Sequence, residues 1–119
     1  MDKVNLPQKF SMFNDLWSPK IVGELNDSHV KLVKLHGEFV WHHHVTEDEL
    51  FLVVKGNLQI KLRDQHIFLK EGEFVILPRG VEHLPIAKDE VHVLLLEPKT
   101  TLNTGNVGNE RTVNDLERI

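Results

Sequence analysis

Residues 37–56, GEFVWHHHVTEDELFLVVKG, and residues 72–87, GEFVILPRGVEHLPIA, decide the fold that the sequence predicts. In both segments a run of aromatic and branched apolar residues lies close to glycine and histidine. Glycine permits the positive φ of hairpin turns, and Pro78 presets a turn and ends a strand. The two segments therefore predict short strands joined by tight turns, with histidines placed on them.

Short apolar segments recur along the chain from Lys20 onward. Turn residues such as Asn26-Asp27-Ser28 and Gly56-Asn57 separate them, a pattern typical of an antiparallel sandwich or barrel. The predicted fold class is therefore all-β. The expected strands cover residues 20–25, 29–36, 39–44, 49–54, 58–62, 66–69, 74–77 and 91–97, with a further short strand around His83.

The two ends of the chain differ from this middle part. Leu6, Phe10 and Phe13 are spaced by four and three residues, which indicates a short helix or a coil packed on the barrel. Thr112 is a suitable N-cap residue and predicts a last short helix over residues 112–118.

Length and composition restrict the possible functions. The 119 residues suit one domain, expected over residues 1–119 with a barrel core at about 20–98. Cysteine is absent, which excludes disulfides and thiolate chemistry and agrees with the cytoplasmic location that we expect. The net charge of -4 offers no basic surface for nucleic acid or anionic membranes, and no apolar run approaches the roughly 20 residues that span a bilayer. The expected partner is a small-molecule ligand.

Three of the eight histidines are consecutive. Because side chains alternate along a strand, His42 and His44 should point to one face of strand 39–44 and His43 to the other. We expect His43 at the surface and the other two imidazoles facing inward together.

Two further residues complete the expected site. Glu49 begins the next strand and should reach the same face, with Glu47 as the competing carboxylate. His83 follows the Pro78-Arg79-Gly80 turn, on a segment expected to run back across the barrel. Three neutral imidazoles and one carboxylate suit one divalent ion of iron, manganese, cobalt, nickel, copper or zinc. The predicted metal ligands are His42, His44, Glu49 and His83.

Other residues are expected around this centre. Phe51 and Val53 share the strand parity of Glu49 and should line an apolar cavity beside the ion. His92 interrupts an apolar strand and is a further candidate for the cavity lining. The candidates for a general base are Glu47, Asp48, Glu82 and His92. The cationic residues expected on solvated faces are Lys31, Lys34, Lys55, Lys61 and Arg63.

These spacings resemble the first motif of the cupin family. That motif reads Gly, five residues, His-x-His, three or four residues, Glu, six residues, Gly. Here His42-His43-His44, Glu49 and Gly56 keep the spacing, whereas four residues instead of five separate Gly37 from His42.

The second cupin motif reads Gly, five residues, Pro-x-Gly, two residues, His, three residues, Asn. Gly72, Pro78, Gly80 and His83 match every spacing, and Ala87 replaces the final Asn, which is not a metal ligand. The chain as a whole resembles the small single-domain cupins of undefined function.

The resemblance implies a small jelly-roll β-barrel in which His42, His44, Glu49 and His83 bind the metal ion. It leaves the reaction open among dioxygenase, isomerase and lyase or hydrolase types, so enzymatic activity is not decided. The alternatives are a non-catalytic module that binds a small ligand in the same cavity, and a structural barrel without an ion.

A homodimer is the expected assembly. An open jelly roll leaves edge strands, which proteins often protect by pairing with a second copy. The N-terminal segment is apolar enough to cross such an interface, through Phe10, Phe13, Leu16 and Trp17.

Overall fold

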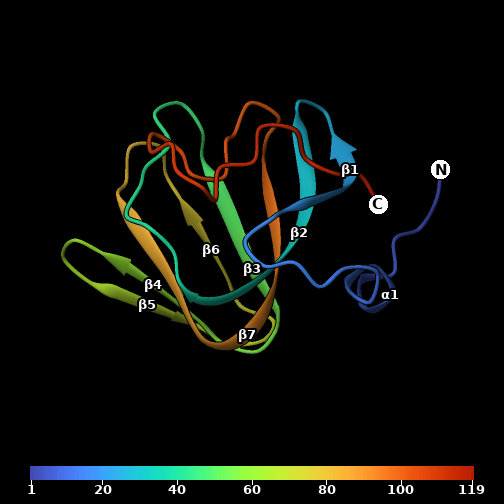
Figure 1. The fold of residues 1–119 in the computed structure, drawn as a ribbon, viewed down its shortest axis with the longest axis horizontal. Helices are drawn as coiled ribbons and strands as arrows, with labels where there is room; N and C mark the ends of the chain where they lie inside the picture. The colour runs from blue at the N-terminus through green and yellow to red at the C-terminus, as the bar shows by residue number, and fades with distance from the viewer.

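Strand β7, His83–Pro98, is the longest element and connects the two halves of the molecule (Figure 1). The computed structural model describes residues 1–119. In this structure β7 pairs antiparallel with β2 (Ser28–Glu38), β3 (Glu49–Lys55) and β4 (Leu58–Leu62). The exposed residues 88–90 separate the part of β7 that pairs with β3 from the part that pairs with β4. One strand therefore serves both sides of the barrel.

The remaining strands complete an antiparallel jelly roll. β1 (Lys20–Leu25) and β6 (Phe74–Leu77) are the two ends of the order β1-β2-β7-β3-β6. β5 (His66–Leu69) pairs with β4, and this hairpin projects to one side of the molecule in Figure 1. The structure confirms the predicted all-β fold class, and four strands keep their expected bounds: residues 20–25, 58–62, 66–69 and 74–77.

The expected strand 39–44 is wrong. Gly37, with a φ of 86°, lies near the end of β2, and the chain then leaves the sheet. Beyond it, His42 forms a single β-bridge with His83, and no ladder continues on either side. The segment is therefore a loop that is pinned at one residue. The expected strand 91–97 and the short strand around His83 are one continuous element, β7.

The expected helix over residues 112–118 is also wrong, because these residues are irregular, with a bend at 114–115 and a β-bridge between Arg118 and Ile21. The Thr112 hydroxyl lies 2.7 Å from the Thr104 hydroxyl and accepts a hydrogen bond of 3.0 Å from the Asn109 backbone N–H. Both bonds connect Thr112 to earlier residues, so its side chain is not available to cap a following helix.

The N-terminal segment packs on its own sheet. The expected helix is confirmed as α1, Leu6–Phe10, and a coil follows it. Phe10 and Phe13 bury Leu32 on the outer side of β2, and Trp17 joins the main core. These aromatic side chains are therefore not free to cross a dimer interface as predicted, and only Leu16 of that group is exposed.

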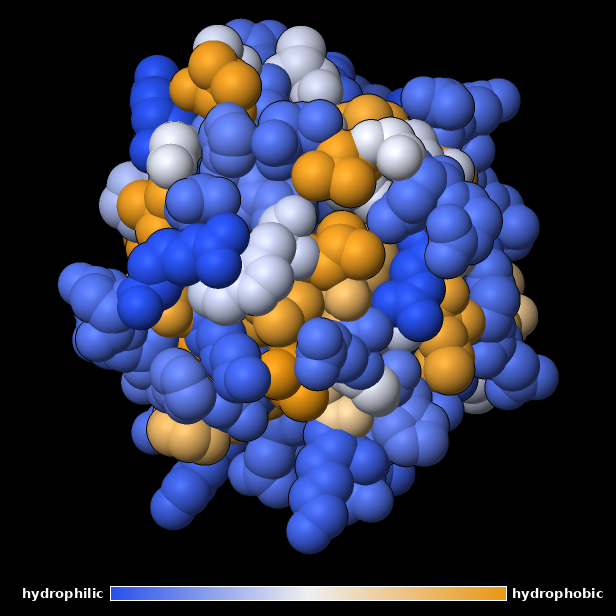
Figure 2. All heavy atoms as spheres, turned by 60° about the vertical axis from the view of Figure 1, so that its left-hand side comes forward, coloured by the Kyte–Doolittle hydropathy of each residue, from blue (hydrophilic) through white to orange (hydrophobic).

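The main hydrophobic core fills the barrel with side chains from β2, β3, β4 and β7. From the side of β4 and β5, hydrophilic residues cover most of the surface and hydrophobic residues emerge between them (Figure 2). The structure contains no helix that is long enough and apolar enough to cross a membrane. The buried residues of this core are Trp17, Val33, Leu35, Phe39, Phe51, Val53, Leu58, Ile60, Leu69, Leu77, Leu84, Ala87, Val91, Val93 and Leu95.

Candidate metal centre

Backbone hydrogen bonds hold the histidine loop against the start of β7. His42 N–H donates to the His83 carbonyl at 3.1 Å, and His83 N–H donates to the His42 carbonyl at 2.9 Å. Gly80 N–H donates to the His44 carbonyl at 2.7 Å. These bonds bring the imidazoles of the two motifs together although about forty residues of chain separate them.

The loop of residues 103–113 supports the same segment from the other side. Asn106 Oδ1 accepts a hydrogen bond from His43 N–H at 2.9 Å, and Asn106 N–H donates to the His43 carbonyl at 3.1 Å. This contact is not predictable from the sequence. A polar loop has no periodic pattern that would place Asn106 beside His43, so the sequence carries no signal for it.

The three histidines of the predicted site are buried and present their ligand nitrogens to one point. His42 Nδ1 and His83 Nδ1 each lie 2.9 Å from a backbone carbonyl, that of Val40 and Val81 respectively. A carbonyl only accepts, so each Nδ1 carries the hydrogen and Nε2 keeps its lone pair. The ligand atoms of His42, His44 and His83 all lie within 4.8 Å of one another.

Glu49 adds a carboxylate to this group. Its Oε1 lies 3.3 Å from His44 Nε2 and 3.4 Å from His83 Nε2, and the residue is 4% exposed. The competing Glu47 is engaged elsewhere, because its Oε2 accepts hydrogen bonds from the hydroxyls of Thr46 and Thr100. The structure thus places Glu49, and not Glu47, beside the histidines.

The electrostatics of the site favour metal-binding protonation states. Burial lowers the pKa of His42 to about 4, so its imidazole is neutral at neutral pH. Burial acts to raise the pKa of Glu49, but the adjacent side chains of Glu97, His44 and His83 outweigh it and hold this pKa well below its usual range. Neutral imidazoles and an ionised carboxylate are the forms that ligate divalent ions.

The donor set fits a metal ion. Both ring nitrogens of His44, His83 Nε2 and Glu49 Oε1 are buried without a hydrogen-bond partner. Buried polar atoms normally have partners, and each one without a partner costs about 1–3 kcal/mol. An ion at the common point would give one donor atom of each of these three residues a partner.

A cavity adjoins the four residues. Its polar lining consists of His42, Glu49, Glu97 and Asn103. Phe51 lies in its wall, whereas Val53 is fully buried in the core and does not line it. The apolar walls are Trp17, Pro19, Val33, Leu35, Phe39, Phe51, Pro85 and Leu95.

The prediction that His92 lines the cavity is wrong. His92 alternates with the inward-facing Val91 and Val93 and therefore points to the outer side of β7. There its ring stacks on Phe10 with 4.5 Å between ring centroids, and Nε2 lies 3.0 Å from Glu90 Oε2.

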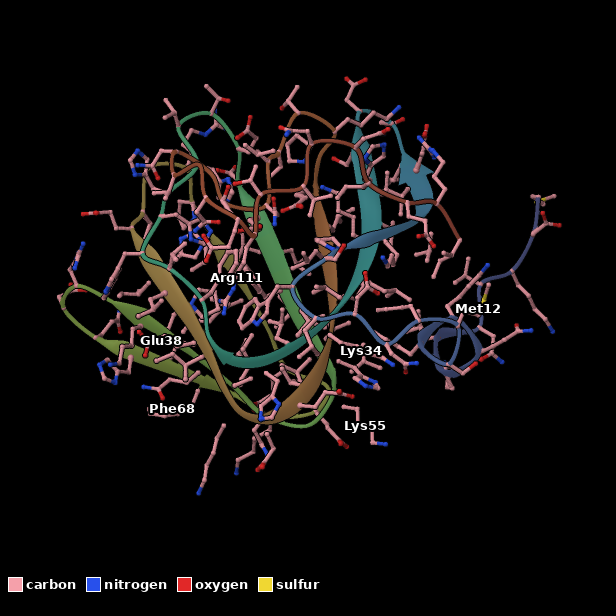
Figure 3. The ribbon with its side chains drawn as sticks, in the orientation of Figure 1. Met12, Lys34, Glu38, Lys55, Phe68 and Arg111 are labelled. Carbon is pink, nitrogen blue, oxygen red and sulfur yellow. The ribbon has the colours of Figure 1, made fainter.

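Two of the lysines expected on solvated faces are buried. Lys31, expected to be solvated, is 1% exposed, and its Nζ lies 2.7 Å from Oε1 of the buried Glu97. Lys34 is also buried and donates to the Phe13 carbonyl at 2.6 Å, under the N-terminal coil (Figure 3). The sequence did contain a signal for Lys31, because it shares the strand parity of Val33, which faces the core.

Fold and site together define a β-barrel with a potential metal centre at one end of a small cavity. Residues 29–98 match the family model described as a cupin domain. The chain belongs to the cupin family, as its two motifs indicated.

Known proteins resemble this chain over different lengths. A cupin-2 domain protein from Shewanella frigidimarina is 51% identical, with 81% of this chain and 94% of the other covered, and a TM-score of 0.80. A protein from Neisseria meningitidis is 27% identical, with 82% and 100% covered and a TM-score of 0.76. The uncharacterized protein YdbB of Bacillus subtilis is 40% identical over 63 residues, which are 52% of this chain and 56% of YdbB. The chain thus matches about half the length of its curated relatives.

Proposed function

We propose that this cupin binds one divalent transition-metal ion through His42, His44, Glu49 and His83, and that the adjoining cavity receives a small molecule. The observation that carries the proposal is the convergence of four buried side chains, of which His44, Glu49 and His83 have donor atoms without a hydrogen-bond partner. The donor set suits iron, manganese, nickel, cobalt, copper or zinc. The single domain and a cytoplasmic location stay predictions from the sequence.

When bound, such an ion supplies Lewis acidity, an activated water or a site for oxygen, which corresponds to isomerase, lyase or hydrolase, and dioxygenase chemistry. The chain's own residues position the ligands and keep water away. The Val40 and Val81 carbonyls fix the ring orientation of His42 and His83. The aromatic and aliphatic walls around Phe39 and Phe51 give the ligand a largely apolar environment.

The surroundings also support the alternative, a non-catalytic module that binds its ligand through the same centre. None of the four general-base candidates lines the cavity. Asp48 pairs with Arg79, and Glu82 pairs with Arg63. Glu47 bonds to threonines and His92 faces outward, so Glu97 is the sole cavity-lining carboxylate besides the proposed ligand Glu49.

Elemental analysis of protein purified without chelator tests the metal centre. We expect about one transition-metal ion per chain, and almost none in the His42→Ala, His83→Ala double variant, because each substitution removes one imidazole ligand. His66→Ala is the matched control, since His66 is exposed on β5 and bonds only to Gln59. Wild-type protein that holds no metal even after reconstitution with iron, manganese, nickel and zinc would contradict the proposal.

We also propose that a second copy covers the outer face of β7, β3 and β6. Leu50 pairs with Ile76 on one side and Leu96 on the other, and Leu52 likewise pairs with Phe74 and Leu94. These two apolar rows end at the free edge of β6, where Phe74 and Ile76 are 58% and 53% exposed. An uncharged sheet face beside an open edge matches another copy of itself.

Light scattering at micromolar concentration checks this assembly. Wild-type protein is expected at twice the chain mass of 13.8 kDa, and the Phe74→Glu, Ile76→Glu double variant at one chain mass, because two buried carboxylates would oppose the pairing. Phe68→Glu is the control, since Phe68 is even more exposed, at 69%, but lies on β5. Wild-type protein at a single-chain mass would contradict the dimer.

A further inference from the structure

The cavity beside the metal centre is too small, as it stands, for the ligand that the proposed function gives it. Its volume is about 40 Å³. Pockets that hold a small molecule usually measure about 300–1,000 Å³. All of the residues that line the cavity are buried except Asn103, so no wide mouth leads into it. A wall must therefore move before such a molecule can enter.

One wall is a coil that few hydrogen bonds hold. Residues 13–19, between α1 and β1, lie outside the sheet and contribute Trp17 and Pro19 to the cavity lining (Figure 1). The sole backbone–backbone hydrogen bond of this segment runs from Trp17 N–H to the Lys34 carbonyl, at 2.9 Å. Segments with few backbone hydrogen bonds open locally without global unfolding. Residues 13–19 are therefore a wall that can open by itself.

The other walls outside the strands are held more firmly. Phe39 N–H donates to the Pro85 carbonyl at 3.0 Å, and His42 makes two backbone hydrogen bonds with the start of β7. Both amide atoms of the Asn103 side chain have backbone partners in their own loop. The remaining lining residues belong to β2, β3 and β7 or to the turn into them, which form the sheet itself. The coil is thus the wall that requires the fewest broken bonds to move.

The Trp17 indole closes the cavity. It stacks on the Phe39 ring with 4.6 Å between ring centroids and 5° between planes, and both rings line the cavity. Arg111 does not line the cavity but lies over both rings, 5.4 and 5.7 Å from their centroids (Figure 3). The indole N–H donates to the His36 carbonyl at 3.0 Å. The indole is therefore the cover between the cavity and the loop that carries Arg111.

The backbone of Trp17 is strained. Its φ of 60° lies in the left-handed region, which a bulky side chain rarely adopts. Such a conformation persists only where the surrounding contacts impose it. Part of the restraint comes from two long side chains: Lys34 Nζ donates to the Phe13 carbonyl at 2.6 Å, and Lys20 Nζ lies 2.6 Å from Asp15 Oδ2. Movement of the coil would release this strain, which favours opening.

We propose that residues 13–19 form a lid on the cavity and that Trp17 is the residue that controls which molecules enter. The lid opens when the indole leaves Phe39, and the cavity then gains the volume that the indole occupied. The strands of the barrel keep their places. This inference rests on the ligand cavity of the proposed function, and it does not require the metal ion.

Hydrogen exchange followed by NMR tests whether the lid opens by itself. The backbone and indole N–H groups of Trp17 both donate to carbonyls of β2, so they exchange when the lid opens. After correction for intrinsic rates, both should exchange about a hundredfold faster than Val53 N–H, which donates to the Glu73 carbonyl from a fully buried residue. Equal protection of Trp17 and Val53 would overturn the inference, because the lid would then open only when the protein unfolds.

Benzene is the probe for the role of the indole. Wild-type protein binds it only during lid opening, whereas Trp17→Ala leaves a permanent apolar space. The variant should therefore bind benzene about tenfold more tightly in a calorimetric titration. Trp41→Ala is the matched control, because it removes the same side chain from a half-buried position that does not line the cavity. Equal affinity of the two variants would overturn the assignment of Trp17.

The outcomes separate the lid from the metal centre. Fast exchange at Trp17 in a protein that holds no metal would keep the lid and refute the metal centre. A metal-loaded protein in which Trp17 exchanges no faster than Val53 would keep the metal centre and refute the lid. If Trp17→Ala does not fold, exchange in wild-type protein still decides whether the lid exists.

Discussion

Protein saturated with its metal ion is expected to melt about 15 °C above protein treated with a chelator. An ion that binds only the folded state at about a thousand times its dissociation constant adds about 4 kcal/mol to the free energy of unfolding. For a domain of this size each kcal/mol corresponds to a shift of about 4 °C. The metal-free site is also a local weakness, because the donors of His44, His83 and Glu49 are buried without partners.

Differential scanning calorimetry of the two forms measures this shift. The matched comparison is the His42→Ala, His83→Ala variant, which should melt at one temperature with or without added metal. The same shift in that variant would show that the ion stabilises the protein from another site. An unchanged melting temperature in wild type, at saturating concentrations of each candidate metal, would argue that the cluster holds no ion.

Replacing Gly105 by alanine is expected to damage the metal centre from outside it. Gly105 has a φ of 56°, and an added Cβ would overlap the His43 carbonyl oxygen and lie 3.1 Å from His42 Cδ2. To relieve this overlap, either the loop of residues 103–113 or the loop that carries His42 and His43 must move. We expect a loss of about 2–3 kcal/mol in unfolding free energy and about tenfold weaker metal binding.

Gly108→Ala is the control for this substitution. Gly108 belongs to the same loop, but it does not have a positive φ and its added Cβ would meet no atom within 4 Å. We expect Gly108→Ala to have nearly the unfolding free energy and metal affinity of wild type. Chemical unfolding measures the first, and competition with a chelator measures the second. Equal behaviour of the two variants would contradict the idea that the loop supports the histidine segment.

Much of the fold and the proposed site could be predicted because both depend on local spacing. β-branched runs between turn residues gave most strand bounds, and alternate residues of the histidine run are buried even though that segment is a loop. His42 and His44 keep the expected parity because the chain there remains extended enough to bridge His83. Glu49 begins its strand, as the apolar run that follows it predicted.

What could not be predicted depends on contacts between distant residues. Asn106 supports His43 across more than sixty positions, and no pattern in either segment indicates it. Lys31 and Glu97 looked like ordinary charged residues, since a single charge in an apolar strand becomes favourable only when its partner on another strand is known. The absence of the expected C-terminal helix likewise depends on Thr104, whose contact with Thr112 is not visible in the local sequence.

The late position of β7 in the chain has a consequence for biosynthesis. β7 lies between β2 and β3 in the sheet although both are translated before it, and such non-local pairing is slow because loop closure must precede it. His42 and His44 are therefore synthesised well before His83 and the supporting Asn106 can hold them. The four side chains of the proposed centre therefore come together only after β7 has docked. If they hold an ion as we propose, it is taken from the ions that the finished chain meets, so the cellular supply of metals and not the order of synthesis decides which ion is bound.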